Sequence, residues 1–204
     1  MSPPSPCRLA VFLARDAPVA VVLRRGPSEW AQLSLWDRAN DRFTPGQWFH
    51  GRVYERRCDL APDGSLFVYF AARHGRGGHD EQGIGEAWTA ISKPPYFTAL
   101  ALWPNPGSWY GGGVFETDGN ILLDTACALE PHPRFRPRGL RIAHLGPETS
   151  PWEQRLLRGG WQLVERGFDP RTHRRVGERE VWEKAHPSHP VKICRQLEDV
   201  DFAR

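Results

Sequence analysis

Two Asp-Gly dipeptides between strand-forming residues constrain this chain more than any other feature of its sequence. One lies within Leu60–Phe70 (LAPDGSLFVYF) and the other within Val114–Leu123 (VFETDGNILL). An Asp-Gly pair between β-formers is the strongest short-range hairpin signal, because glycine tolerates the positive φ that the turn needs. We therefore expect two hairpins in a chain built from similar short strands.

Further strand and turn signals follow at the short spacing of β-sandwiches and β-barrels. Leu9–Leu13 and Val19–Leu23 are nearly continuous apolar runs, which predicts strands buried on both faces. Trp30–Trp36 and Phe43–Phe49 are expected to form a hairpin that turns at Asp37–Asp41, with Pro45-Gly46 marking a second bend. The remaining predicted strands are Val53–Leu60, Leu66–Ala72, Ala87–Ile91, Tyr96–Trp103, Ser108–Phe115, Leu140–His144, Trp161–Glu165, Glu180–Lys184 and Val191–Cys194.

One helix is expected, over residues 151–158. Ser150 is placed to cap it, Pro151 occupies the first helical position, and Glu153 completes a capping box three residues after the serine. Gly159-Gly160 ends the pattern. The sequence thus predicts an all-β, mainly antiparallel protein with one short helix. We expect a single domain over residues 1–204 with a disordered proline-rich end at residues 1–6.

The first hairpin segment resembles the Ser/Ala-Pro-Asp-Gly hairpin of WD40-like and TolB-like β-propeller blades. Thr117–Leu122 (TDGNIL) and Trp36–Phe43 (WDRANDRF) are weaker matches, and the resemblance covers about a quarter of the chain. It implies radially arranged four-stranded sheets and a protein-binding platform. The Gly-His and Trp-Asp pair of complete blades is missing. A propeller-like arrangement, a sandwich and a barrel therefore all stay open.

Composition limits the classes of partner and the cellular compartment. The net charge is only +3, and Lys occurs only at 93, 184 and 192, so 24 of the 27 basic residues are Arg. This bias is typical of a GC-rich bacterial genome, and interleaved acidic residues leave no long basic stripe. The four cysteines form no CxxC motif, and no apolar run reaches the ~20 residues of a membrane helix. We expect a cytoplasmic protein with free thiols and no membrane association.

Catalytic and cofactor motifs are absent from the sequence. It contains no Gly-x-Ser-x-Gly, His-Glu-x-x-His or Walker motif, so we predict no catalytic residue, no cofactor and no metal. His74, His79, Asp80 and Glu81 share a glycine-rich loop, and a mobile loop without supporting contacts holds a metal poorly. A second candidate is an acid–base cluster of His50, Tyr54, Glu55 and Asp59. On a strand, Arg57 between Glu55 and Asp59 is more simply an ion-pair ladder.

Two surface sites remain as binding hypotheses. Trp103, Trp109 and Tyr110 flank one turn (WPNPGSWY), and exposed aromatic residues at a rigid turn are typical of protein interfaces. Packing in the core is the alternative, most of all for Trp103. The second hypothesis is contact with nucleic acid or another anion by an extended segment. Its residues are Arg134, Phe135, Arg136, Arg138 and Arg141.

These observations favour a non-catalytic function. We interpret the chain as a bacterial interaction or scaffold module, or an accessory subunit, that binds another protein. A nucleic-acid-associated accessory protein is the first alternative. An inhibitor of a partner enzyme in an immunity or defence system is another. An enzyme whose site is assembled from distant loops is a further alternative, because active sites are spatial. The oligomeric state is not predicted.

Overall fold

A computed structural model describes residues 7–26, 29–73, 83–125, 130–169, 174–175, 179–185, 188 and 190–196. The chain divides into two compact units, Met1–Leu145 and Gly146–Arg204, which are described separately. The expected disordered end at residues 1–6 lies outside the described residues. No helix in the described part of the chain is long and apolar enough to cross a membrane. The structure confirms the predicted all-β class, with one short α-helix among the residues that it describes.

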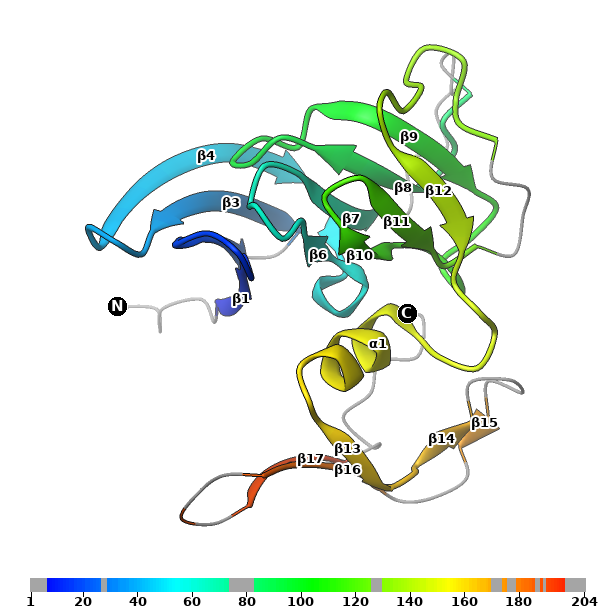
Figure 1. Ribbon diagram of the computed structural model, residues 1–204. Helices are drawn as coiled ribbons and strands as arrows, with labels where there is room; N and C mark the ends of the chain where they lie inside the picture. Colours follow the sequence, from blue (N-terminus) through cyan, green and yellow to red (C-terminus); the bar gives the residue numbers. More distant parts are fainter. Residues whose placement is uncertain are drawn as a thin grey trace, which may run out of the picture. The chain divides into compact units, whose positions relative to one another are not determined.

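The first unit contains three sheets (Figure 1). One is an antiparallel meander in the order β1-β2-β3-β4, and a second has the order β5-β7-β8-β9 with β6 also paired to β7. In the third, β10 and β11 are antiparallel and β12 runs parallel to β11. The strands of the meander are β1 (Arg8–Leu13), β2 (Val19–Arg25), β3 (Trp30–Asp37) and β4 (Arg42–His50). The others are β5 (Arg52–Val53), β6 (Asp59–Leu60), β7 (Phe67–Ala72), β8 (Ala87–Ser92), β9 (Ala99–Asn105), β10 (Gly113–Thr117), β11 (Asn120–Leu123) and β12 (Arg141–His144).

Both Asp-Gly dipeptides lie at strand reversals, as predicted. Gly64 has φ +79° in the loop between β6 and β7, so the conformational argument for glycine holds there. Gly119 lies in the two-residue connection between β10 and β11 without a positive φ, so that argument was wrong at the second corner. The two corners also contact each other, because Asp118 Oδ1 accepts a hydrogen bond from the Asp63 backbone N–H at 2.9 Å.

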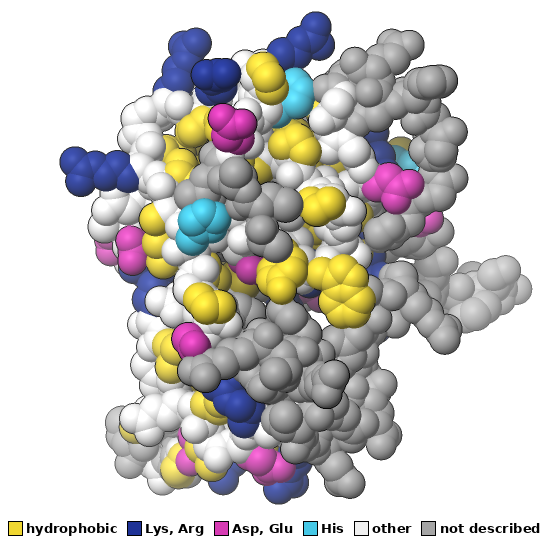
Figure 2. Space-filling view, turned by 90° about the vertical axis from the view of Figure 1, so that its right-hand side faces the viewer, with side chains coloured by type: hydrophobic (Ala, Val, Ile, Leu, Met, Phe, Trp, Pro, Cys, Tyr) yellow, Lys and Arg dark blue, Asp and Glu magenta, His cyan; other side chains and the backbone are white. Residues whose placement is uncertain are grey.

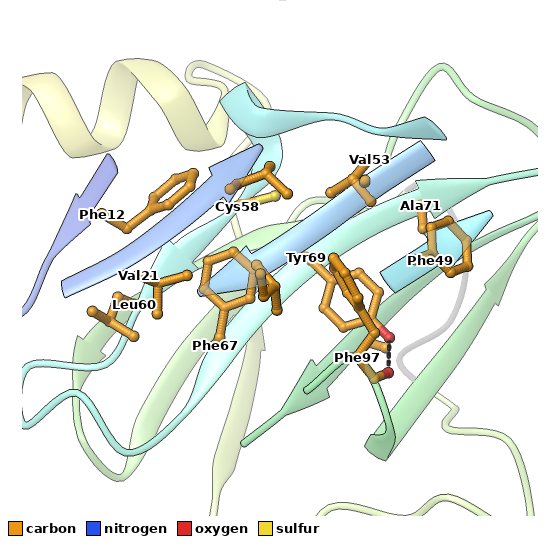
Figure 3. Packing of buried hydrophobic residues seen from close by; sticks show 14 of the residues in the cluster. Phe12, Val21, Phe49, Val53, Cys58, Leu60, Phe67, Tyr69, Ala71 and Phe97 are labelled. Carbon is orange, nitrogen blue, oxygen red and sulfur yellow. Dashed lines mark hydrogen bonds between the residues drawn. The ribbon is translucent and has the colours of Figure 1, made fainter. Parts of the chain in front are cut away.

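The three sheets are layered through two apolar clusters. One face of the β1–β4 sheet packs against one face of the β7–β9 strands, with Phe12, Val21, Phe67 and Tyr69 among the buried side chains (Figure 3). The opposite face of β7–β9 packs against the β10–β12 sheet. Every residue of β7 and β8 is buried, because these strands have an apolar layer on both sides. None of the described sheets closes into a barrel, so the barrel alternative was wrong, whereas a propeller or sandwich arrangement stays a prediction.

One local prediction in this unit was wrong, and another takes a particular form. Val53–Leu60 is not one strand: β5 is followed by a 3-10 helix, η1 (Glu55–Arg57), and then by β6. The second bend predicted at Pro45-Gly46 lies within β4, at a register shift in its pairing with β3. In both places an irregular backbone interrupts the pairing, and alternation of residue types does not reveal such an interruption.

The second unit is built around the predicted helix, α1 (Pro151–Arg158). Ser150 Oγ accepts from the Glu153 N–H, and the Glu153 carboxylate accepts from the Ser150 N–H at 2.7 Å, so the capping box is confirmed. The predicted pairing of Trp161–Glu165 with Glu180–Lys184 is also confirmed, and the last strand adds to it. The strands are β13 (Gln162–Glu165), β14 (Phe168–Asp169), β15 (Arg174–Arg175), β16 (Arg179–Lys184) and β17 (Val191–Gln196).

Candidate functional site

The face of the β1–β4 sheet that points away from the core exposes large apolar side chains. On β1, Leu9, Val11 and Leu13 are 64, 49 and 54% exposed, while the alternate residues Ala10 and Phe12 pack into the core. The expectation that this strand is buried on both faces was therefore wrong. Both faces of β1 are apolar, but the core packs against only the face with Ala10 and Phe12.

The strand register places apolar side chains on this same face of all four strands. One row across the sheet consists of Leu13, Ala20, Trp36 and Phe43, and the next consists of Val11, Val22, Ser34 and Pro45. We call the set the outer face. Its members are Leu9, Val11, Leu13, Ala20, Val22, Arg24, Trp30, Gln32, Ser34, Trp36, Phe43, Pro45, Trp48 and His50.

Aromatic rings contact one another at both ends of β3 and β4. Trp36 stacks on Phe43 with ring centroids 5.4 Å apart, and Trp36 Nε1 donates to Asp41 Oδ1 at 2.9 Å. At the other end Trp30 makes edge-to-face contacts with Trp48 and His50. These ring contacts restrain side chains that are nevertheless 43–55% exposed (Trp30 43%, Trp48 43%, Phe43 55%).

A β-bulge in β4 sets the position of Trp48. The register shifts by one residue between the Ser34↔Pro45 and Gln32↔Trp48 pairs. A Cβ on Gly46 would lie 2.1 Å from the Pro95 carbonyl oxygen, so only glycine permits this approach. Gln47 N–H donates to that same oxygen at 3.0 Å. The bulge thus fixes β4 to the segment before β9 and returns Trp48 to the outer face.

Arg24 lies over the Trp48 ring, with its guanidinium carbon 5.6 Å from the ring centroid. The centre of the outer face therefore combines an aromatic surface with one cation and the side chains of Gln32 and Ser34. Contiguous apolar patches of this kind are uncommon on monomeric soluble proteins and mark interaction sites. Aromatic residues beside an arginine are also the composition of interface hot spots.

The predicted aromatic turn is divided between core and surface. Trp103 is buried on β9, whereas Trp109 is 61% exposed and Tyr110 is half-buried. Arg57 holds this turn: its guanidinium donates to the carbonyl oxygens of Ser108 at 2.7 Å and of Trp109 at 3.0 Å. The turn therefore presents one large ring, Trp109, on a fixed backbone.

The Gly111–Gly113 run lies beside this clamp, and its glycines permit close backbone approach, as expected. A Cβ on Gly111 would lie 2.1 Å from the Phe70 ring, and one on Gly112 would lie 2.0 Å from the Arg57 carbonyl oxygen. Asp124 accepts from the Gly111 N–H and faces Arg57. Burial raises the pKa of Asp124 to about 6, and the Arg57 charge offsets part of that rise. Burial also lowers the pKa of Arg57.

The predicted anion-contact segment is exposed at its arginines. All four arginines of the segment are exposed: Arg134, Arg136, Arg138 and Arg141. Figure 1 places this part of the chain at the upper end of the first unit, and Figure 2 shows basic side chains at that end. Phe135 instead packs against the main core and lies 5.5 Å from the His132 ring. The four arginines thus remain accessible to an anion, while the ring expected to stack on a base is largely occupied by the core.

The predicted acid–base cluster is dispersed in the structure. His50 lies 3.5 Å from Glu29, Glu55 pairs with Arg25, and the buried Asp59 accepts a hydrogen bond from the Phe115 N–H. The expected ladder around Arg57 was wrong, because η1 turns its side chain toward Ser108 and Trp109.

Potential metal ligands and free thiols are the remaining reactive groups of the described residues. None of them form a group of three or more potential metal ligands, and the loop with His74, His79, Asp80 and Glu81 lies outside the described ranges. Cys7 and Cys194 are exposed free thiols and Cys58 is a buried one.

Comparisons with known protein families, with curated proteins and with solved structures give no match for this chain. Its site must therefore be inferred from its own residues. Sequence reasoning identified the strands of the outer face but missed the face itself. The available signal was the continuous apolar pattern of Leu9–Leu13 beside the aromatic pairs Trp30/Trp48 and Trp36/Phe43. That pattern indicates two apolar faces, but it does not tell how many of them the rest of the chain covers.

Proposed function

We propose that the Met1–Leu145 unit is a non-catalytic binding module and that its outer face binds another protein. The observation that supports the proposal is the placement of six large apolar side chains, each at least 43% exposed, on one face of one sheet. These six are Leu9, Val11, Leu13, Trp30, Phe43 and Trp48.

A protein partner suits this surface better than a small molecule or a nucleic acid does. The face is formed by side chains of a pleated sheet rather than by a concave pocket, and ligand pockets for small molecules are concave. The arginine along its centre, Arg24, lies against Trp48. Protein interfaces have an apolar, aromatic centre with arginine and a polar rim, and the outer face has this composition.

Quantitative capture of partners tests the proposal. Wild type is compared with a Phe43→Lys, Trp48→Lys double variant and with Tyr96→Lys, a control that places a charge at another exposed aromatic residue, 56% exposed, outside the face. Both variants should fold, because they replace exposed side chains. A partner that survives nuclease treatment, is lost with the double variant and is kept with the control supports the proposal. A partner retained equally by all three proteins contradicts it.

Anion binding by the arginine segment is the second candidate function. It is supported by four exposed arginines within eight residues, Arg134 to Arg141. Binding of a labelled single-stranded oligonucleotide should then fall steeply with salt. Replacing the three arginines at 134, 136 and 138 by Gln should reduce the salt dependence of oligonucleotide binding. The Phe43→Lys, Trp48→Lys variant should leave that salt dependence unchanged.

A further inference from the structure

The free edge of β1 has a backbone ready to pair with another strand. The Ala14 N–H donates to the Val19 carbonyl at 2.9 Å, which makes these two residues a hydrogen-bonded pair. In an antiparallel ladder such pairs recur at every second residue, so residues 8, 10 and 12 also bond to β2. The backbone N–H and C=O groups of Leu9, Val11 and Leu13 therefore point away from β2. No strand among the described residues pairs with that edge.

The β1 edge also lacks the features that protect three other edges of this unit, those of β4, β9 and β12. β4 carries a proline and the bulge at Gly46, and β9 is covered by hydrogen bonds between Leu102 and the segment 132–135. β12 is four residues long and has Arg141 and His144 at its ends. β1 has six residues without proline or bulge, and its single charge lies at its first residue. Natural edge strands normally carry such blocking features.

We propose that β1 pairs antiparallel with β1 of a second copy of this chain, about a two-fold axis at Val11. In this register Val11 meets Val11 of the partner subunit, and Leu9 meets Leu13 of the partner subunit. Ala10 meets Phe12 of the partner subunit on the core side. All of these opposite residues are apolar, the small Ala10 faces the large Phe12, and the outer faces of the two copies lie on the same side of the joined sheet.

Pairing of this kind gives hydrogen-bond partners to the backbone N–H and C=O groups at the free edge of β1. Leu9, Val11 and Leu13 each form a hydrogen-bonded pair, with two bonds to a pair, so roughly six inter-chain hydrogen bonds result. The same segment repeated by symmetry gives a closed, isologous interface. A segment of an unrelated protein would need its own matching register, whereas the second copy carries it already. Dimerisation depends on the β1 backbone, whereas binding of another protein depends on the side chains of the outer face, so the two can be tested independently.

Charge exchange at the two-fold axis tests the pairing. Side chains directly opposite in a ladder lie ~5 Å apart, so like charges at position 11 repel and unlike charges attract. Val11 is 49% exposed, and replacing it therefore buries no charge in the monomer. Sedimentation velocity between about 1 and 200 µM should show wild type as a dimer in micromolar equilibrium, since strand pairing alone is smaller than a standard interface.

Val11→Lys and Val11→Asp should each weaken association at least about 10-fold, and an equal mixture of the two variants should restore it to near the wild-type value. Val11→Pro should also give a monomer, because it removes an N–H that points to the free edge. Tyr96→Lys adds the same charge at an exposed residue outside both β1 and the outer face and should remain dimeric. A monomeric wild type, a dimeric Val11→Lys variant, or failure of the mixture to associate would each overturn the proposal.

Discussion

Replacing Gly112 by alanine should destabilise the first unit by about 2–6 kcal/mol. Gly112 has φ +88°, a conformation in which an L-residue is strained by ~1–3 kcal/mol. Its new Cβ would lie 2.0 Å from the Arg57 carbonyl oxygen. That oxygen belongs to backbone and does not rotate away, so the chain must shift, and overpacking of this kind adds ~1–3 kcal/mol.

Thermal unfolding followed by tryptophan fluorescence measures the effect, with an expected fall in Tm of roughly 5–20 °C. Gly107→Ala is the matched control, because a Cβ at that position would have no atom within 4 Å and the φ of Gly107 is not positive. We expect the control to change the free energy of unfolding by no more than ~0.5 kcal/mol. Equal stability of Gly112→Ala and wild type would refute the close approach of the glycine run to η1.

Three further changes test other parts of the structure. Burial raises the pKa of Asp124 from 3.8 to about 6, so the protonated carboxyl stabilises the fold fully below pH 3.8 and this stabilisation is lost as the pH rises through 6. Asp124→Asn should remove up to about 3 kcal/mol of the resulting pH dependence of the unfolding free energy, measured in urea titrations. An unchanged pH profile would contradict the raised pKa of Asp124. Tyr69→Phe should cost about 1–3 kcal/mol in the same titration, because the hydroxyl donates to the buried Phe97 carbonyl (Figure 3), and a neutral result would argue against that bond. Ser150→Ala should destabilise α1 by ~1 kcal/mol and speed amide exchange in its first turn, whereas Thr149→Ala should leave exchange unchanged.

The elements that were predictable are those whose signals are local. Ser150, Pro151 and Glu153 define a helix start within four residues, and the structure has that helix with both reciprocal bonds of the capping box. The Asp-Gly corners define strand reversals in the same way. The glycine run was also interpretable, since three consecutive glycines without a flexible context indicate close approach of backbone.

The features that were not predictable depend on distant partners. Arg57 was expected to pair with its sequence neighbours, but η1 places it beside Ser108 and Trp109, more than fifty residues away. The contact between Asp63 and Asp118 joins two corners that the sequence could only identify separately. The exposed face of β1 was missed for the same reason, because coverage of a strand depends on how many layers the rest of the chain supplies.

Site-specific photocrosslinking in the native host tests the binding role of the outer face most directly. A photoreactive phenylalanine analogue at Phe43 or Trp48, both exposed on that face, is compared with the same analogue at Tyr96. We predict a crosslinked protein partner from positions 43 and 48 that does not form from position 96. Adducts identical at all three positions, or none at positions 43 and 48, would contradict the assignment of this face as the binding surface.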